Sequence, residues 1–130
     1  MIGHIRAHAW LACIVGTVVA TAQAHHSNVA FETEKIAEVR GAVVAWQWTN
    51  PHTWLRLSVA DGHGGQVEWA FEGRPPGLLT RVGWTPTMFA KGDTLTVHYS
   101  PAKDGTHTGL IARVTLADGT ILAYTPPTVP

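Results

Sequence analysis

Short segments in which apolar and polar residues alternate recur through most of this sequence, and they constrain its fold most strongly. Successive side chains of a strand point to opposite faces, so an alternation of period two predicts strands with one buried face. Six segments show this pattern: Ile36–Trp48, Thr53–Ala60, Gln66–Glu72, Thr94–Ser100, Leu110–Leu116 and the short Ile121–Tyr124. Turns rich in glycine, aspartate and proline separate most of them, which indicates an all-β chain.

The segment between the third and fourth expected strands lacks this alternation. Leu78, Leu79 and Val82 are spaced for a short helix that begins near Pro75-Pro76. Three strands, a short helix and two further strands are the element order of an OB-like barrel. Gly41, in the middle of the first strand, fits the bend that a small barrel needs there. We therefore predict a small OB-like antiparallel barrel of five to six strands, with a β-sandwich as the alternative.

The first residues of the chain predict export. Ala9–Ala20 is an uninterrupted run of small or apolar residues that is too short to span a bilayer. Ala22-Gln23-Ala24 fits a small-x-small cleavage site, and Ala20-Thr21-Ala22 is an alternative one. We expect a periplasmic or secreted protein with these parts: a signal peptide over 1–24, an amino-terminal arm over 25–35, a barrel over 36–125 and a proline-rich tail over 126–130.

Charge and cysteine content exclude several classes of partner and site. The chain carries nine Lys/Arg and nine Asp/Glu, and its single cysteine, Cys13, lies inside the expected signal peptide. Near-neutrality argues against nucleic acid, which favours a clustered basic face. No segment after Ala24 is long and apolar enough to cross a membrane. Without cysteine, the exported domain can form neither a disulfide nor a thiolate metal site.

A histidine pair directly after the cleavage site gives the clearest indication of chemistry. Cleavage after Ala24 makes His25 the amino terminus, and its amine and imidazole then form a bidentate chelate. One further imidazole would complete a T-shaped nitrogen site of the histidine-brace type, which suits Cu(II). Cleavage after Ala22 instead places histidine third, which also gives a square-planar Cu(II) or Ni(II) site.

We therefore predict copper as the cofactor, with the candidate ligands His25, His26, His52 and His98. The alternative for His25-His26 is a polar arm that binds nothing. His63 and His107 lie in turns rich in glycine or aspartate, and we expect them to be solvated.

The tryptophans provide a second hypothesis that does not involve a metal. Those near the Asn50-Pro51 turn either form a small additional core or present an aromatic platform to a small apolar ligand or a partner segment. The predicted ligand-binding residues are Trp46, Trp48, Asn50, Trp54 and Trp84. Unbroken alternation puts Trp46 and Trp48 on the face opposite Val43, and it puts Trp69 in the core.

No residue is assigned to catalysis. The serines lie in no nucleophile-elbow context. Glu68 and Glu72 share one face of a strand but lie too far apart for a glycosidase pair, so we expect both to face solvent. The sequence favours a non-enzymatic binding protein, and a copper oxidoreductase that uses the same ligands is a further alternative.

Several motifs resemble those of a bacterial family of small exported proteins, domain of unknown function 6152. They are His25-His26-Ser27, Trp48-Thr49-Asn50-Pro51-His52-Thr53-Trp54, Trp69-Ala70-Phe71-Glu72, Gly83-Trp84-Thr85, Lys91-Gly92-Asp93 and Asp118-Gly119. The Asn-Pro-His turn between tryptophans is the most specific of these motifs. The resemblance implies an exported β-rich domain, and it implies no activity.

Overall fold

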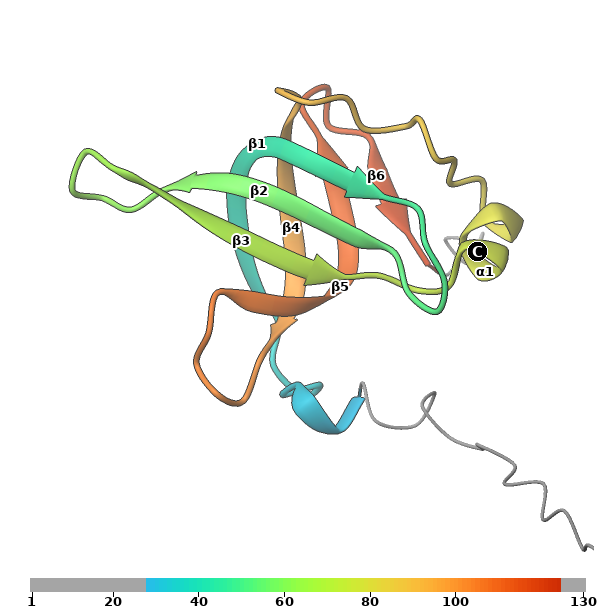
Figure 1. Ribbon diagram of the computed structural model, residues 1–130, viewed down its shortest axis with the longest axis horizontal. Coiled ribbons are helices and arrows are strands. Elements are labelled where there is room, and N and C mark those ends of the chain that lie inside the picture. The colour runs from blue at the N-terminus through green and yellow to red at the C-terminus, as the bar shows by residue number, and fades with distance from the viewer. Residues whose placement is uncertain (1–27, 125–130) are drawn as a thin grey trace, which may run out of the picture.

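Six strands, one short α-helix and one 3-10 turn make up the computed structural model, which describes residues 28–124 (Figure 1). The strands are β1 (Ala37–Gln47), β2 (Trp54–Ala60), β3 (Gln66–Glu72), β4 (Thr94–Pro101), β5 (Thr108–Leu116) and β6 (Ile121–Ala123). Helix α1 (Pro76–Arg81) connects β3 to β4, and η1 (Asn28–Ala30) precedes β1. The expected signal peptide and the His25-His26 pair lie outside the described residues.

A parallel pairing between β3 and β5 closes five of the strands into a barrel. The strands β1, β2 and β3 are antiparallel neighbours, β4 pairs with the other side of β1, and β5 pairs with β4. Residues 70–72 of β3 then pair in parallel with residues 108–110 of β5, so these five strands have no free edge. The predicted OB-like barrel is confirmed, the sandwich alternative is wrong, and β6 extends the sheet from β5.

Strand β1 belongs to both halves of the barrel. Its first half pairs with β4 and its second half pairs with β2. At Gly41, a Cβ atom would lie 2.6 Å from the carbonyl oxygen of Ser58 and 2.9 Å from Cγ2 of Val59. The two strands approach so closely here that only glycine fits without displacing backbone.

A β-bulge in β1 changes the face that the end of this strand presents. Val43 and Ala45 face successive residues of β2, so Val44 between them has no partner of its own. Trp46 consequently lies opposite the fully buried Leu55 and packs against the core. The prediction that Trp46 lies on the face opposite Val43 is therefore wrong, because the extra residue shifts the alternation.

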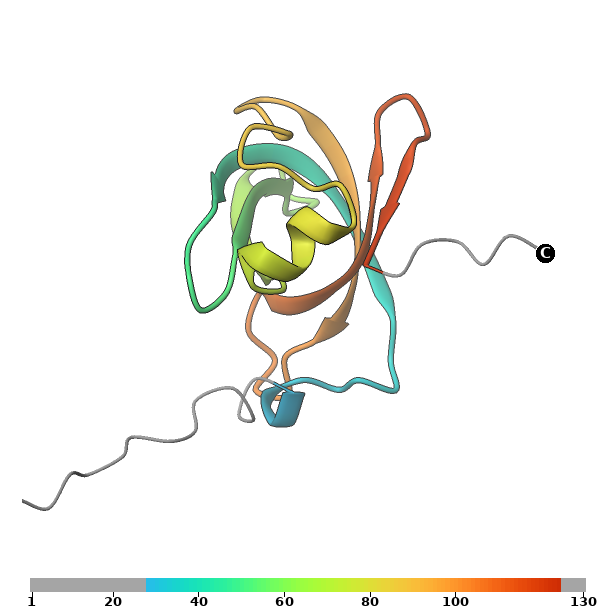
Figure 2. The same ribbon diagram turned by 90° about the vertical axis from the view of Figure 1, so that its right-hand side faces the viewer.

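The segment that follows β3 covers one end of the barrel. Leu79 of α1, Trp84 and Phe89 are buried and join the core formed by the inward-facing residues of the strands. Figure 2 shows α1 lying across this end. In Figure 1 the β2–β3 hairpin extends from the opposite end, away from α1. Within residues 28–124, no helix has the length and hydropathy needed to cross a bilayer.

The predicted strands match the observed ones to within two residues at each end. The largest difference is at the start of β5, which begins at Thr108 instead of Leu110. These first residues of β5 form the pairing that closes the barrel. Their partners on β3 are far away in sequence, so local alternation does not indicate them.

We expect Gly41→Ala to lower the free energy of unfolding by about 1–3 kcal/mol, which is the usual cost of overpacking. The carbonyl of Ser58 that a Cβ would meet belongs to the β1–β2 ladder and cannot move alone. Gly77→Ala is the matched control, because a Cβ there meets no atom within 4 Å and alanine favours the helix. Urea unfolding measures both variants, and equal stabilities would contradict the close approach at Gly41.

Candidate functional site

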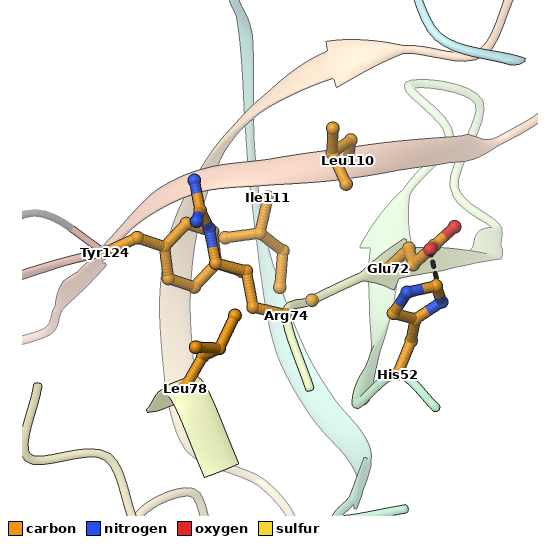
Figure 3. Close-up of a pocket in the computed structure, with 8 residues that line it drawn as sticks. His52, Glu72, Arg74, Leu78, Leu110, Ile111 and Tyr124 are labelled. Atoms are coloured by element: carbon orange, nitrogen blue, oxygen red, sulfur yellow. Dashed lines mark ion pairs between the residues drawn. The ribbon is translucent and has the colours of Figure 1, made fainter. Parts of the chain in front are cut away.

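A small hollow lies where the turn between β1 and β2 meets the end of β3 (Figure 3). Its volume is about 210 Å³, and its lining residues are His52, Glu72, Gly73, Arg74, Leu78, Leu110, Ile111 and Tyr124. They come from the β1–β2 turn, the end of β3, α1, β5 and the residue after β6. Three charged or titratable side chains and a tyrosine thus converge on one concave surface, as is typical of ligand sites.

A histidine–glutamate pair forms one wall of this hollow. Nδ1 of His52 lies 2.7 Å from Oε1 of Glu72, and the two side chains are 20% and 8% exposed. The two atoms are in direct contact, but the ring is not aligned for a well-directed hydrogen bond, and Oε1 has no hydrogen-bond partner in the described chain. A buried carboxylate oxygen in this state is energetically costly, which marks Glu72 as a candidate functional residue.

The burial of Glu72 corrects the prediction that both carboxylates of β3 face solvent. Glu68 does so, and it pairs with Arg56, which is also exposed. Glu72 is only 6% exposed. It lies opposite Leu110 of β5 in the parallel pairing, and the imidazole of His52 covers its carboxylate.

Hydrogen bonds tie the turn that carries His52 to the end of β3. Oγ1 of Thr49 donates to the carbonyl oxygen of His52 over 3.1 Å, which closes the turn on itself. Oγ1 of the fully buried Thr53 donates to the carbonyl oxygen of Arg74 over 3.0 Å. The amide of Gly73 donates to the carbonyl oxygen of Thr53 over 2.8 Å. These bonds hold the imidazole beside the carboxylate.

Arg74 and Tyr124 form the other wall of the hollow. Cζ of Arg74 lies 5.1 Å from the centre of the Tyr124 ring, and Figure 3 shows the guanidinium turned towards this ring and away from His52 and Glu72. Burial raises the pKa of Tyr124. Its hydroxyl lies near the backbone of Arg74 but makes no well-directed hydrogen bond within the described residues. The one cationic side chain of the lining therefore sits apart from the histidine–glutamate pair.

His98 lies on the outer face of the barrel, with partners at both ring nitrogens. Its Nδ1 is 3.4 Å from Oε2 of Glu38 and 3.3 Å from Nη2 of Arg113. Its Nε2 is 3.5 Å from Oγ1 of Thr115. A guanidinium this close to a ring nitrogen repels a metal cation, so His98 is poorly placed as a ligand.

The structure does not bring His52 and His98 into one cluster. From Asn28 to Tyr124, no group of three or more His, Cys, Asp or Glu side chains is arranged to hold a metal ion. His63 is exposed in the β2–β3 turn, as predicted. His25 and His26 lie outside the described residues, so a metal site that uses His52 needs ligands from that part of the chain.

A second hollow adjoins the first one on the side of the arm. Its volume is about 320 Å³, and it shares Arg74, Leu110, Ile111 and Tyr124 with the first. The arm residues Thr33 and Ile36 also line it. The amide of Glu32 donates to the carbonyl oxygen of Pro101 over 2.9 Å, which ties the arm to β4. The arm and His52 therefore border two neighbouring hollows that share part of their lining.

Three of the tryptophans predicted to bind a ligand form an aromatic cluster under the β3–β4 connection. The ring centroids of Trp48, Trp84 and Phe89 lie 5.2–6.1 Å from that of Trp46. Nε1 of Trp46 donates to the carbonyl oxygen of Thr85 over 3.0 Å, and Trp84 is only 2% exposed.

The two other residues of that prediction lie away from this cluster. Trp54 begins β2, is half-buried, and lies opposite the exposed Gln47. Asn50 is exposed in the β1–β2 turn. The sequence did not indicate Glu72, Arg74 or Tyr124 as site residues, because the β3–β5 pairing and the position of β6 bring them together.

Comparison with known proteins gives a family and no activity. The model of a family described as "Family of unknown function (DUF6152)" matches residues 11–113. This range includes His52, Glu72 and Arg74. No curated protein matches the chain in sequence.

We expect His52→Ala to lower the free energy of unfolding by about 1–3 kcal/mol, because it removes the imidazole that contacts the buried Glu72 carboxylate. Adding Glu72→Gln removes the buried charge and should restore part of this loss. Chemical denaturation of the single and double variants measures both effects.

Arg56→Ala is the matched control for the buried pair. The distance between Nη1 of Arg56 and Oε1 of Glu68 is also 2.7 Å, but these side chains are 44% and 49% exposed. Replacing Arg56 by alanine should lower the free energy of unfolding by about 0–1 kcal/mol. A loss for His52→Ala that is no larger than this would show that the pair at Glu72 is not effectively buried.

Proposed function

This chain belongs to the family of unknown function DUF6152, and from its own residues we propose that it is an exported, non-enzymatic copper-binding protein. The proposed site joins the amino terminus created by cleavage after Ala24 to the imidazole of His52. The amine and ring of His25 supply two nitrogens, and His52 supplies the third. His26 is next to His25 in the sequence. The observation that carries the proposal is the contact between His52 and the buried Glu72.

A carboxylate at Nδ1 suits a histidine that binds a metal through its other nitrogen. Metal-bound imidazoles commonly direct their second ring nitrogen at a carboxylate, which fixes the ring and raises its basicity. Glu72 contacts Nδ1 of His52 over 2.7 Å, so Nε2 is the nitrogen offered to copper. The negative charge of Glu72 also offsets the charge of a nearby Cu(II).

The surroundings favour His52 over His98 as the third ligand. His52 lines a hollow, and the one cation of that hollow, Arg74, is turned towards Tyr124. His98 has a guanidinium 3.3 Å from its Nδ1. Binding copper at His98 would therefore require this cation to move away.

The course of the arm supports the approach of the terminus to His52. Thr33 and Ile36 of the arm line a hollow that shares four residues with the hollow of His52 and Glu72. In the proposed site, the terminal amine of His25 and Nε2 of His52 bind the same copper ion. Nitrogen ligands in this arrangement favour Cu(II) over softer or harder metals.

We expect the secreted protein, with a mass that identifies His25 as its first residue, to bind about one Cu(II). Glu72→Gln keeps the shape of the site and should weaken copper binding about 10- to 100-fold, the usual effect of losing the partner of a metal-bound histidine. His52→Ala and an alanine added before His25 should weaken it further. Copper titration followed by EPR spectroscopy measures affinity and coordination together.

His63→Ala is the control, because His63 is exposed in the β2–β3 turn and should leave binding unchanged. Spectra and affinities that do not respond to His52→Ala would contradict the proposed third ligand. Spectra and affinities that are unchanged by the added alanine would contradict the role of the terminal amine. A protein cleaved after Ala22 would bind copper without His52, and its mass would identify this case.

A further inference from the structure

The end of the barrel opposite α1 contains a larger hollow that the proposed copper site does not use. Its volume is about 690 Å³, and its lining residues are Val39, Val59, Ala60, Asp61, Gln66, Val67, Trp69 and His107. They come from β1, the end of β2, the β2–β3 turn, β3 and the β4–β5 loop. This volume falls within the range of small-molecule sites, which is about 300–1,000 Å³.

The floor of this hollow is apolar, and within residues 28–124 it lies open. Val59 is 8% exposed and belongs to the core, and Val39, Val67 and Trp69 pack against that core. At the other end of the barrel, α1 and Trp84 seal the interior. Apolar surface that is left open in a concave site favours an apolar occupant.

The ring of Trp69 is held in place by other aromatic rings. Phe71 stacks with it at a centroid distance of 5.9 Å, and Tyr99 meets it edge-on at 5.4 Å. His107 lies at 4.8 Å with a tilt of 32°. A fixed indole that lines a hollow is suited to a flat occupant, since aromatic contacts need little reordering there.

The charge at the rim of the hollow is negative. Asp61 is the lining residue with a permanent charge, and no Lys or Arg lines this hollow in the described chain. Oδ1 of Asp61 accepts hydrogen bonds from the amides of His63 and Gly65, over 2.8 and 2.9 Å. These bonds lower the pKa of Asp61, so its carboxylate stays ionised. Indole rings also attract cations.

We propose that the open end of the barrel binds a small, flat organic cation, with its ring against Trp69 and the valine floor and its charge facing Asp61. The size of the hollow, its apolar floor, the fixed indole of Trp69 and the negative charge at the rim all favour this class of ligand. The site shares no residue with the proposed copper site, so a negative result for one proposal does not affect the other.

Proflavine and acridine provide a matched pair of probes, since both are flat tricyclic molecules. At a pH above the pKa of acridine and below that of proflavine, only proflavine is a cation. Isothermal titration calorimetry on the whole, copper-free protein should show proflavine binding and several-fold weaker binding of acridine. Asp61→Asn keeps the acceptor for the turn amides and should abolish this preference.

Two lysine substitutions test whether proflavine binds in this hollow. Gln66→Lys adds a positive charge at the exposed rim of the hollow and should weaken proflavine binding about fivefold, as expected for one nearby like charge. Gln47→Lys makes the same change at an exposed residue of β1 that does not line the hollow, and it should have no effect. Equal effects of the two substitutions, equal binding of the two probes, or no proflavine binding would overturn the proposal.

Discussion

The parallel pairing between β3 and β5 is the contact on which the rest of the structure depends. It joins residues 70–72 to residues 108–110, the two segments that close the barrel. It also buries the end of β3, so that Glu72 becomes an interior carboxylate while Glu68 on the same strand stays exposed. Closure also defines two ends of the barrel. In the part of the chain that the structure describes, α1 and Trp84 seal one end, and the other is open at Trp69.

The burial of Glu72 makes the histidine–glutamate pair energetically different from an ordinary surface ion pair. The pairs His52–Glu72 and Arg56–Glu68 have the same nitrogen–oxygen distance of 2.7 Å. Water screens the exposed pair, which therefore contributes little. Glu72 has its oxygen out of contact with water and without a well-directed hydrogen bond, so a cation at the far side of His52 would strengthen the contact. In the proposed site, copper is that cation.

Alternation predicted the strands of this fold well, because burial of one strand face is a local property of the sequence. The spacing of apolar residues after Pro75-Pro76 predicted the helix. Alternation failed where a residue depends on a distant part of the chain. The bulge at Val44 turned Trp46 inward, and Glu72 is buried by a strand that begins 36 residues later. The sequence around His52 did indicate the turn that contains part of the candidate site. Its partners Arg74 and Tyr124 were missed, because only the closed barrel brings them to the same hollow.

The number of imidazoles bound to Cu(II) shows whether the amino terminus and the β1–β2 turn meet at one metal ion. Electron spin echo envelope modulation detects the remote nitrogen of each coordinated imidazole. For the secreted protein loaded with one Cu(II), we expect modulation from two imidazoles, and from one when His52 is replaced by alanine. A single coordinated imidazole in the unaltered protein, or a pattern that survives His52→Ala, would contradict the proposed copper site.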